Sequence, residues 1–160
     1  MAATVTLPKS IAERARREAE KLGVSLEEFI VELLIQGLDP RDRAAGYVEA
    51  SEELLGQAKE ELRKGDTRQA AEKAWGAAAL AVKAYAMCRE GKRLTSHGEL
   101  WRYRRRLAKE VGKWVKISWA YANMMHTCFY ENWCDREDVG DALEYIERLV
   151  SEVRSRVERT

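Results

Sequence analysis

Apolar residues recur every three or four positions along most of this chain, which is the spacing of helices that bury one face. The stretch ATVTLP at residues 3–8 is the exception, because it alternates Thr4 and Thr6 with Val5 and Leu7. Such alternation is typical of a strand, since successive side chains of a strand point to opposite faces. The pattern therefore predicts a short N-terminal strand followed only by helices.

Turn and capping residues divide the rest of the chain into seven predicted helices. Pro8 opens the first, and Ser25 with Glu28 and Ser96 with Glu99 have the spacing of capping boxes. The other boundaries are set by glycines, which end helices, and by aspartates, which cap helix starts: Gly23, Gly37, Gly65, Asp66, Gly91 and Asp135.

The predicted fold is all-α, with residues 1–38 forming an arm of one strand and two helices and residues 39–160 forming an up-down helical bundle. The arm helices are expected to bury apolar stripes that include Ile11, Leu22 and Leu33 with Leu34. The segment AWGAAALAVKAYA at 74–86 consists mostly of small side chains, which let neighbouring helices approach closely. We expect this segment in the middle of the bundle.

The amino-acid composition indicates the environment in which the protein works. Glu, Lys and Arg are abundant while Asn and Gln together number five, a balance typical of thermophilic proteins. The three cysteines lack the spacing of a disulfide framework, which favours a reducing compartment. No apolar run is long enough to span a bilayer, and the first residues lack the features of a signal peptide. We therefore expect a cytoplasmic protein with no membrane partner.

Charge is distributed unevenly, although the net charge is only +1. Residues 89–116 hold ten basic and three acidic side chains, so the remainder of the chain is acidic. Within this segment, WRYRRRLAK places Arg102, Arg105, Arg106 and Lys109 on one helical face, and Arg104 on the apolar side, where it needs a carboxylate or a site to reach. The cationic face is either simply solvated or a contact surface for a phosphate backbone, helped by the aromatic residues beside it.

The helix predicted near residues 113–132 carries two apolar faces. One, expected to be core, consists of Trp114, Ile117, Tyr121, Met124 and Cys128. The other is a ridge that mixes aromatic and polar side chains at steps of three and four: Trp119, Asn123, His126, Tyr130 and Trp133.

Two interpretations of this ridge stay open. Its polar groups either bond to the protein's own backbone inside the core, or line a pocket for a flat ligand such as a base. In the second case His126 would exchange a proton and Glu131 would stand at the rim. No spacing of metal ligands and no glycine-rich phosphate loop occurs, so neither a metal nor another cofactor is expected.

The arm resembles a ribbon-helix-helix unit, a dimeric DNA-binding fold. The resemblance places Thr4 and Thr6 where that family reads the major groove, and residues 25–27 where it clamps phosphate. The strand lacks a basic reader and the helix start is acidic, so the resemblance implies a homodimer element more than a DNA reader.

The segments KAWGAAALAVKAYA, SHGELWRY and HTCFYENW are similar to those of the archaeal paREP family, which is placed among the HEPN-like bundles. The resemblance runs from about Leu7 to Val150 and implies an up-down bundle, often dimeric, with a possible nucleotidyltransferase partner as in other HEPN systems. Many HEPN proteins are ribonucleases that carry an Arg and a His separated by four to six intervening residues. Only three residues separate Arg93 from His97, and no Arg lies near enough upstream of His126, so the motif is absent.

Three functions follow, in order of preference. The first is a non-catalytic module that binds RNA, other nucleic acid or a nucleotide through the basic helix and the ridge. The second is a divergent, toxin-like ribonuclease that uses His126. The third is a DNA-binding regulator that uses the arm.

Overall fold

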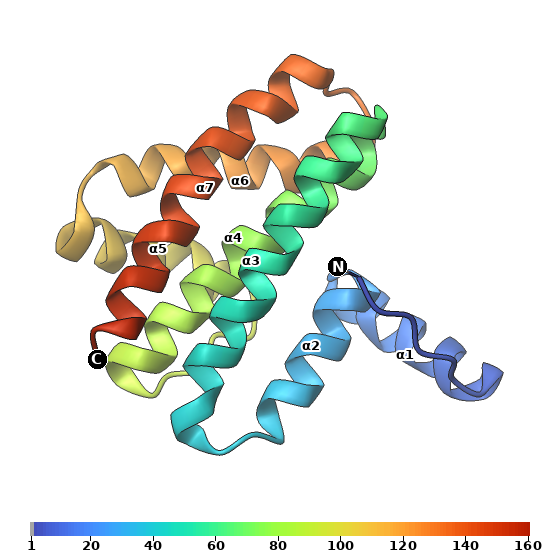
Figure 1. The fold of residues 1–160 in the computed structure, drawn as a ribbon, viewed down its shortest axis with the longest axis horizontal. Coiled ribbons are helices and arrows are strands. Elements are labelled where there is room, and N and C mark those ends of the chain that lie inside the picture. Colours follow the sequence, from blue (N-terminus) through green and yellow to red (C-terminus); the bar gives the residue numbers. More distant parts are fainter. Residues whose placement is uncertain (1) are drawn as a thin grey trace.

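The computed structural model describes residues 2–160, and for residues 40 and 41 it describes the backbone alone. Within this range the chain forms seven helices and no strand: α1 Lys9–Leu22, α2 Leu26–Gln36, α3 Pro40–Lys64, α4 Thr67–Glu90, α5 His97–Val111, α6 Trp114–Glu131 and α7 Arg136–Glu158. Figure 1 shows α3 to α7 gathered around α4, with α1 and α2 set to one side. The all-α prediction is confirmed.

Helix α4 is the centre of the bundle, as the small side chains at 74–86 predicted. Every residue of that segment is buried, and α4 packs against α3, α5, α6 and α7. At Gly76 a Cβ atom would meet Leu54 Cδ1 at 3.0 Å, so α3 comes close to α4 only because that position is bare. On the same face, the buried Ser51 hydroxyl donates a 2.6 Å hydrogen bond to the Ala77 carbonyl.

The helix ends follow the predicted capping residues with one difference. Ser96 and Glu99 form a complete capping box, and Gly23 and Gly91 end α1 and α4 in left-handed conformation. The Ser25 side chain accepts from the Glu28 backbone N–H, but the Glu28 carboxylate turns away from the cap to pair with Lys83. The helix start is therefore capped from one side only.

The predicted N-terminal strand is wrong. Residues 2–7 have no regular structure, and none of their backbone groups bonds to another backbone group of the described chain. A strand is stable only when a neighbour completes its hydrogen bonds, and no other extended segment of residues 2–160 lies beside this one.

The arm buries much less of its apolar surface than its sequence predicts. Helix α1 packs mainly on α2 and projects away from the bundle (Figure 1). Of the exposed large apolar side chains in the described chain, most lie on the arm: Val5, Leu7, Ile11, Leu22, Leu33, Leu34 and Leu38. The expectation that Ile11, Leu22, Leu33 and Leu34 are buried is therefore wrong for the single chain.

Charged contacts join the arm to the bundle. Lys83 of α4 is 5% exposed, and its Nζ lies 2.6 Å from Glu32 Oε1 and 3.3 Å from Glu28 Oε1 of α2. The Tyr47 hydroxyl donates to Glu32 Oε2 at 2.9 Å. Among apolar side chains of α2, Ile35 reaches the main core. The arm thus depends on a buried cation and its carboxylates where the bundle depends on close packing.

Candidate functional site

The two histidines of the chain lie together, although 29 positions separate them. His97 is the first residue of α5, His126 lies on α6, and their ring centroids are 4.6 Å apart. Trp75 of α4 completes the group, with its ring 4.7 Å from His126 and stacked on His97 at 5.3 Å. Three helices therefore bring two imidazoles and an indole into one cluster, which we call the histidine cluster.

The environment keeps His126 neutral. Burial, and then the nearby His97, lower the pKa of His126 from 6.5 to about 4. Burial, and then the Glu27 carboxylate, raise the pKa of Glu72, which lines the same small cavity. At neutral pH His126 thus offers ring nitrogens for hydrogen bonding without a positive charge, so it does not attract phosphate.

The turn between α1 and α2 covers the histidine cluster. A Cβ atom on Gly23 would lie 3.7 Å from Cε1 of His97. The cavity left beside His126 has a volume of about 10 Å³, which suits one water molecule and no base. It is lined by Gly23, Ser25, Glu72, Trp75, His126, Phe129 and Tyr130.

The ridge predicted on α6 begins in the core at Trp119 and ends at the surface at Trp133. Trp119 is 1% exposed and packs on Trp75 at 5.3 Å. Tyr130 is exposed, with its ring edge-on to His126 at 5.1 Å. The remaining predicted members are exposed and outside the cluster: Asn123, Glu131 and Trp133. The structure thus brings His126 and Tyr130 together over a buried Trp119, with no ligand-sized pocket along the row.

The opposite face of α6 was predicted correctly only in part. Cys128 is buried as expected, and Trp114, Tyr121 and Met124 are partly buried against the core, but Ile117 is 50% exposed. Val115 and Met125, which the prediction left out, are completely buried. Because α6 is apolar on most sides, its sequence pattern leaves the direction of the core undetermined within about a third of a turn. Packing of Trp119 against α4 decides that direction.

A disulfide joins Cys128 to Cys134, with the two Cα atoms 5.6 Å apart. Asn132 ends α6 in left-handed conformation and turns the chain back, so that Cys134 meets the last turn of the helix. The number and spacing of the cysteines did not indicate this bond.

The basic helix carries cations of two kinds. Arg106 is neutralised, since its Nη1 lies 2.5 Å from Glu90 Oε1 and its Nε lies 3.1 Å from Glu110 Oε1. The other three predicted face residues are exposed and form no ion pair with any described residue: Arg102, Arg105 and Lys109. Only the Nε of Arg102 is engaged, donating to the Gly98 carbonyl at 3.0 Å. We call these three side chains the cationic face of α5.

Arg104 finds an aromatic ring in place of a carboxylate. Its guanidinium carbon lies 3.9 Å above the ring of Trp101, which is 43% exposed. Desolvation, followed by Arg105, lowers the pKa of Arg104, and its buried Nε has no hydrogen-bond partner in the described chain. A stacked guanidinium and indole beside free cations is an arrangement that receives both phosphates and bases.

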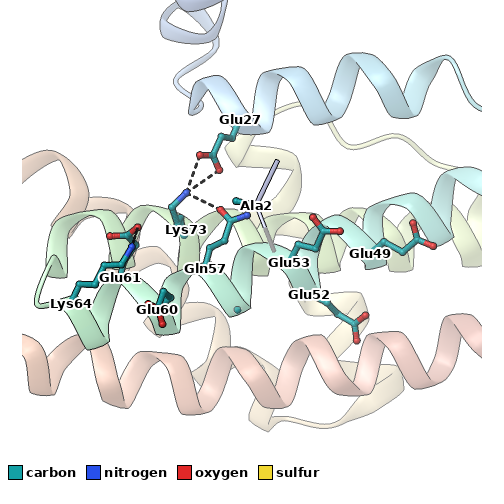
Figure 2. Close-up of a pocket in the computed structure, with 11 residues that line it drawn as sticks. Ala2, Glu27, Glu49, Glu52, Glu53, Gln57, Glu60, Glu61, Lys64 and Lys73 are labelled. Atoms are coloured by element: carbon teal, nitrogen blue, oxygen red, sulfur yellow. Dashed lines mark hydrogen bonds and ion pairs between the residues drawn. The ribbon is translucent and has the colours of Figure 1, made fainter. Parts of the chain in front are cut away.

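An acidic groove with a volume of about 830 Å³ lies between the arm and α3. Figure 2 shows Lys73 inside it, bonded to Glu27 of α2 and Gln57 of α3. The other carboxylates along it come from α3: Glu49, Glu52, Glu53, Glu60 and Glu61. This surface repels polyanions.

Sequence reasoning missed the partners of His126 and of Lys83. No pattern in the sequence links His97 to His126, because helix packing alone brings them together. Lys83 did carry a signal: a lysine within a run of small apolar residues is buried, and a buried cation requires carboxylates nearby. Glu28 and Glu32, one turn apart on a single helix, fit that requirement.

The described residues contain no group of three or more His, Cys, Asp or Glu side chains placed to hold a metal ion. Nor does any described helix have the length and hydropathy needed to cross a membrane.

Fold and surface together define an all-helical bundle with one cationic helix and a helical arm. The chain belongs to the archaeal PaREP1/PaREP8 family, whose family model matches residues 46–150. No curated protein and no solved structure matches the chain.

Proposed function

We propose that this protein is a non-catalytic module that binds single-stranded nucleic acid along α5. The observation that carries the proposal is the cationic face: Arg102, Arg105 and Lys109 are exposed and form no ion pair with a described residue, whereas Arg106 on the same helix pairs with Glu90 and Glu110. Free cations release bound counterions from a polyanion when they meet it, which supplies the binding free energy.

Aromatic side chains beside the cationic face favour a single strand over a duplex. Trp101, stacked on Arg104, is exposed next to Arg105, so a base can stack where its phosphate is neutralised. The face spans eight residues of helix, 102–109, about 10 Å, which suits a few nucleotides. The acidic groove at α3 directs a polyanion away from that surface.

Charge reversal tests this proposal. Arg102→Glu with Arg105→Glu is expected to weaken binding of a single-stranded RNA oligomer at least tenfold, measured by fluorescence anisotropy at fixed salt. The matched control is Arg136→Glu, which reverses an exposed cation at the start of α7, where a negative charge suits the helix dipole. Equal weakening by control and test variants would show that net charge, not this face, is responsible.

A ribonuclease is the second candidate, favoured by the contact between the two imidazoles. One imidazole can accept a proton while a second donates one, as general acid–base cleavage of RNA requires. The pKa of His126, about 4, and the α1–α2 turn that lies over His126 weigh against this candidate. Cleavage of RNA by the purified protein, lost in His126→Ala with the helical content unchanged, would place this candidate first.

The arm supports a homodimer as the assembly in which this module works. Leu33 and Leu34 are 54% and 68% exposed, and Val5 is 78% exposed, so the arm presents apolar surface that a second copy of the arm can cover. Light scattering is expected to give twice the monomer mass, and Leu33→Glu with Leu34→Glu to give the monomer. The DNA-binding alternative then predicts duplex binding that disappears with the dimer.

A further inference from the structure

The α1–α2 turn lies directly against the histidine cluster. Gly23 approaches His97, and Gly23 and Ser25 line the water-sized cavity beside His126. The bundle contributes the floor and the other walls through α4, α5 and α6. If the turn moved away, Trp75 and both imidazoles would border open solvent.

Ion pairs and apolar contacts together hold the arm on the bundle. Lys83 binds Glu28 and Glu32 in a buried cluster, and Lys73 binds Glu27 at 2.9 Å (Figure 2). Ile35 belongs to the main core and Val31 packs against it. One oxygen of the buried Glu28 carboxylate, Oε2, has no hydrogen-bond partner in the described chain. A buried charge cluster with an unsatisfied oxygen contributes little net free energy to docking, because desolvation offsets attraction, so these ion pairs add little to the stability of the docked arm.

The surface beneath the turn continues the cationic face of α5. His97, Trp101 and Arg105 occupy successive turns along one side of that helix. The cluster offers a stack of flat rings at the N-terminal end of the row, among them the neutral imidazole of His126. A strand whose phosphates lie on Arg105 and whose base stacks on Trp101 would bring its next base to His97.

We propose that the α1–α2 turn is a removable cover, and that the Trp75–His97–His126 surface beneath it is a stacking site for one nucleobase of a single strand. The nucleobase part of this inference rests on the proposed function, whereas the cover does not. In the closed structure the turn takes the place of the base.

Lys83→Met tests the cover. Methionine fills the space of the lysine stem in the bundle core, while Glu28 loses its cation and Glu32 keeps only Arg93, whose Nε lies 4.0 Å from Glu32 Oε2. The buried charge of Glu28 is then more stable when hydrated, which opening of the arm allows. The arm is expected to open, and carbethoxylation of His97 and His126 by diethyl pyrocarbonate to accelerate at least tenfold. The chain holds only these two histidines, so mass spectrometry assigns the product directly.

The matched control also removes the charges of the two glutamates that Lys83 binds, so no ion pair is restored and no carboxylate is left without its cation. In Lys83→Met with Glu28→Gln and Glu32→Gln no charge is buried, so the arm is expected to close and histidine reactivity to return to the wild-type rate. Hydrogen exchange of α2 reports whether the arm moved. Faster exchange in Lys83→Met with unchanged histidine reactivity would overturn the cover. Unchanged exchange would overturn the role of Lys83 in holding it.

Binding of a single-stranded RNA oligomer tests the stacking site separately. Lys83→Met is expected to bind at least threefold more tightly than wild type, and adding His97→Ala to remove that gain. Failure of the gain with faster histidine modification would leave a cover without a base site, overturning the second half of the inference. Failure of all RNA binding would overturn the proposed function, and histidine reactivity would still decide the cover.

Discussion

The arm and the bundle are built from helices of similar amphipathic pattern, yet different forces hold them. In the bundle, α4 is buried along thirteen consecutive residues and its neighbours approach over alanine and glycine. In the arm, several leucines remain exposed, and a buried ion pair joins the arm to the bundle. The difference shows that an apolar stripe predicts a helix with more certainty than it predicts what covers the stripe.

The two modes of attachment imply two stabilities. Close packing in the bundle makes its helices unfold together, because each depends on the same core around α4. Under the cover proposed above, the arm detaches without unfolding the bundle and belongs to the regions that open at low free energy. This difference in stability suits an arm that covers the proposed site and a bundle that carries it.

The largest effect is expected from removing apolar volume in the two regions. Leu80→Ala in α4, at a position with no exposure, should lower the free energy of unfolding by about 2–5 kcal/mol through lost burial and a cavity. Ile11→Ala on α1, at a position that is 51% exposed, should change it by less than about 0.5 kcal/mol. Urea titration followed by circular dichroism measures both, and similar losses would remove the distinction between the regions.

A smaller effect is expected from the disulfide, which strengthens the bundle alone. Cys134→Ser opens the short ring that ties α6 to the start of α7, and should lower the free energy of unfolding by about 2 kcal/mol. Wild-type protein in a strong thiol reductant should match the variant. A variant as stable as the oxidised wild type would show that the bond contributes nothing to the fold.

The smallest effect is a pH dependence located where arm and bundle meet. The unfolded chain takes up a proton on His126 below about pH 6.5, whereas the folded protein does so only near its lowered pKa of about 4. Stability should therefore be complete above pH 7 and fall as pH drops from 6.5 towards 4. For this half-exposed group the loss is on the order of 1 kcal/mol after solvent screening.

His126→Asn isolates this contribution, because the amide is polar but does not titrate. Unfolding at pH 7.5 and pH 5 should show a larger loss for wild type than for the variant. The same loss in both proteins would assign the pH dependence to carboxylates elsewhere.

The sequence predicted local structure well wherever a short-range signal decides it. The capping residues Ser96 and Asp66 start helices, and the alanine-rich centre of α4 is buried as expected. The strand at residues 3–8 failed because strand formation depends on a partner that no local pattern reveals. The inward face of α6 was predicted only in part because a helix apolar on most sides has no single stripe to follow.

The site was predictable only in part for the same reason. The cationic face follows from spacing along one helix, so Arg102, Arg105 and Lys109 were found, and only the pairing of Arg106 needed coordinates. The histidine cluster depends on three helices and the turn above it. Such contacts arise from the packing of helices, and no short-range pattern in a single sequence predicts them.

Salt dependence of binding to single-stranded RNA tests the proposed function most directly. If three free cations on α5 neutralise three phosphates, the logarithm of the association constant should fall with the logarithm of salt concentration with a slope of about −2. Arg105→Glu should make that slope shallower by about 0.7 or more. A slope near zero, or one that Arg105→Glu leaves unchanged, would contradict binding through this helix.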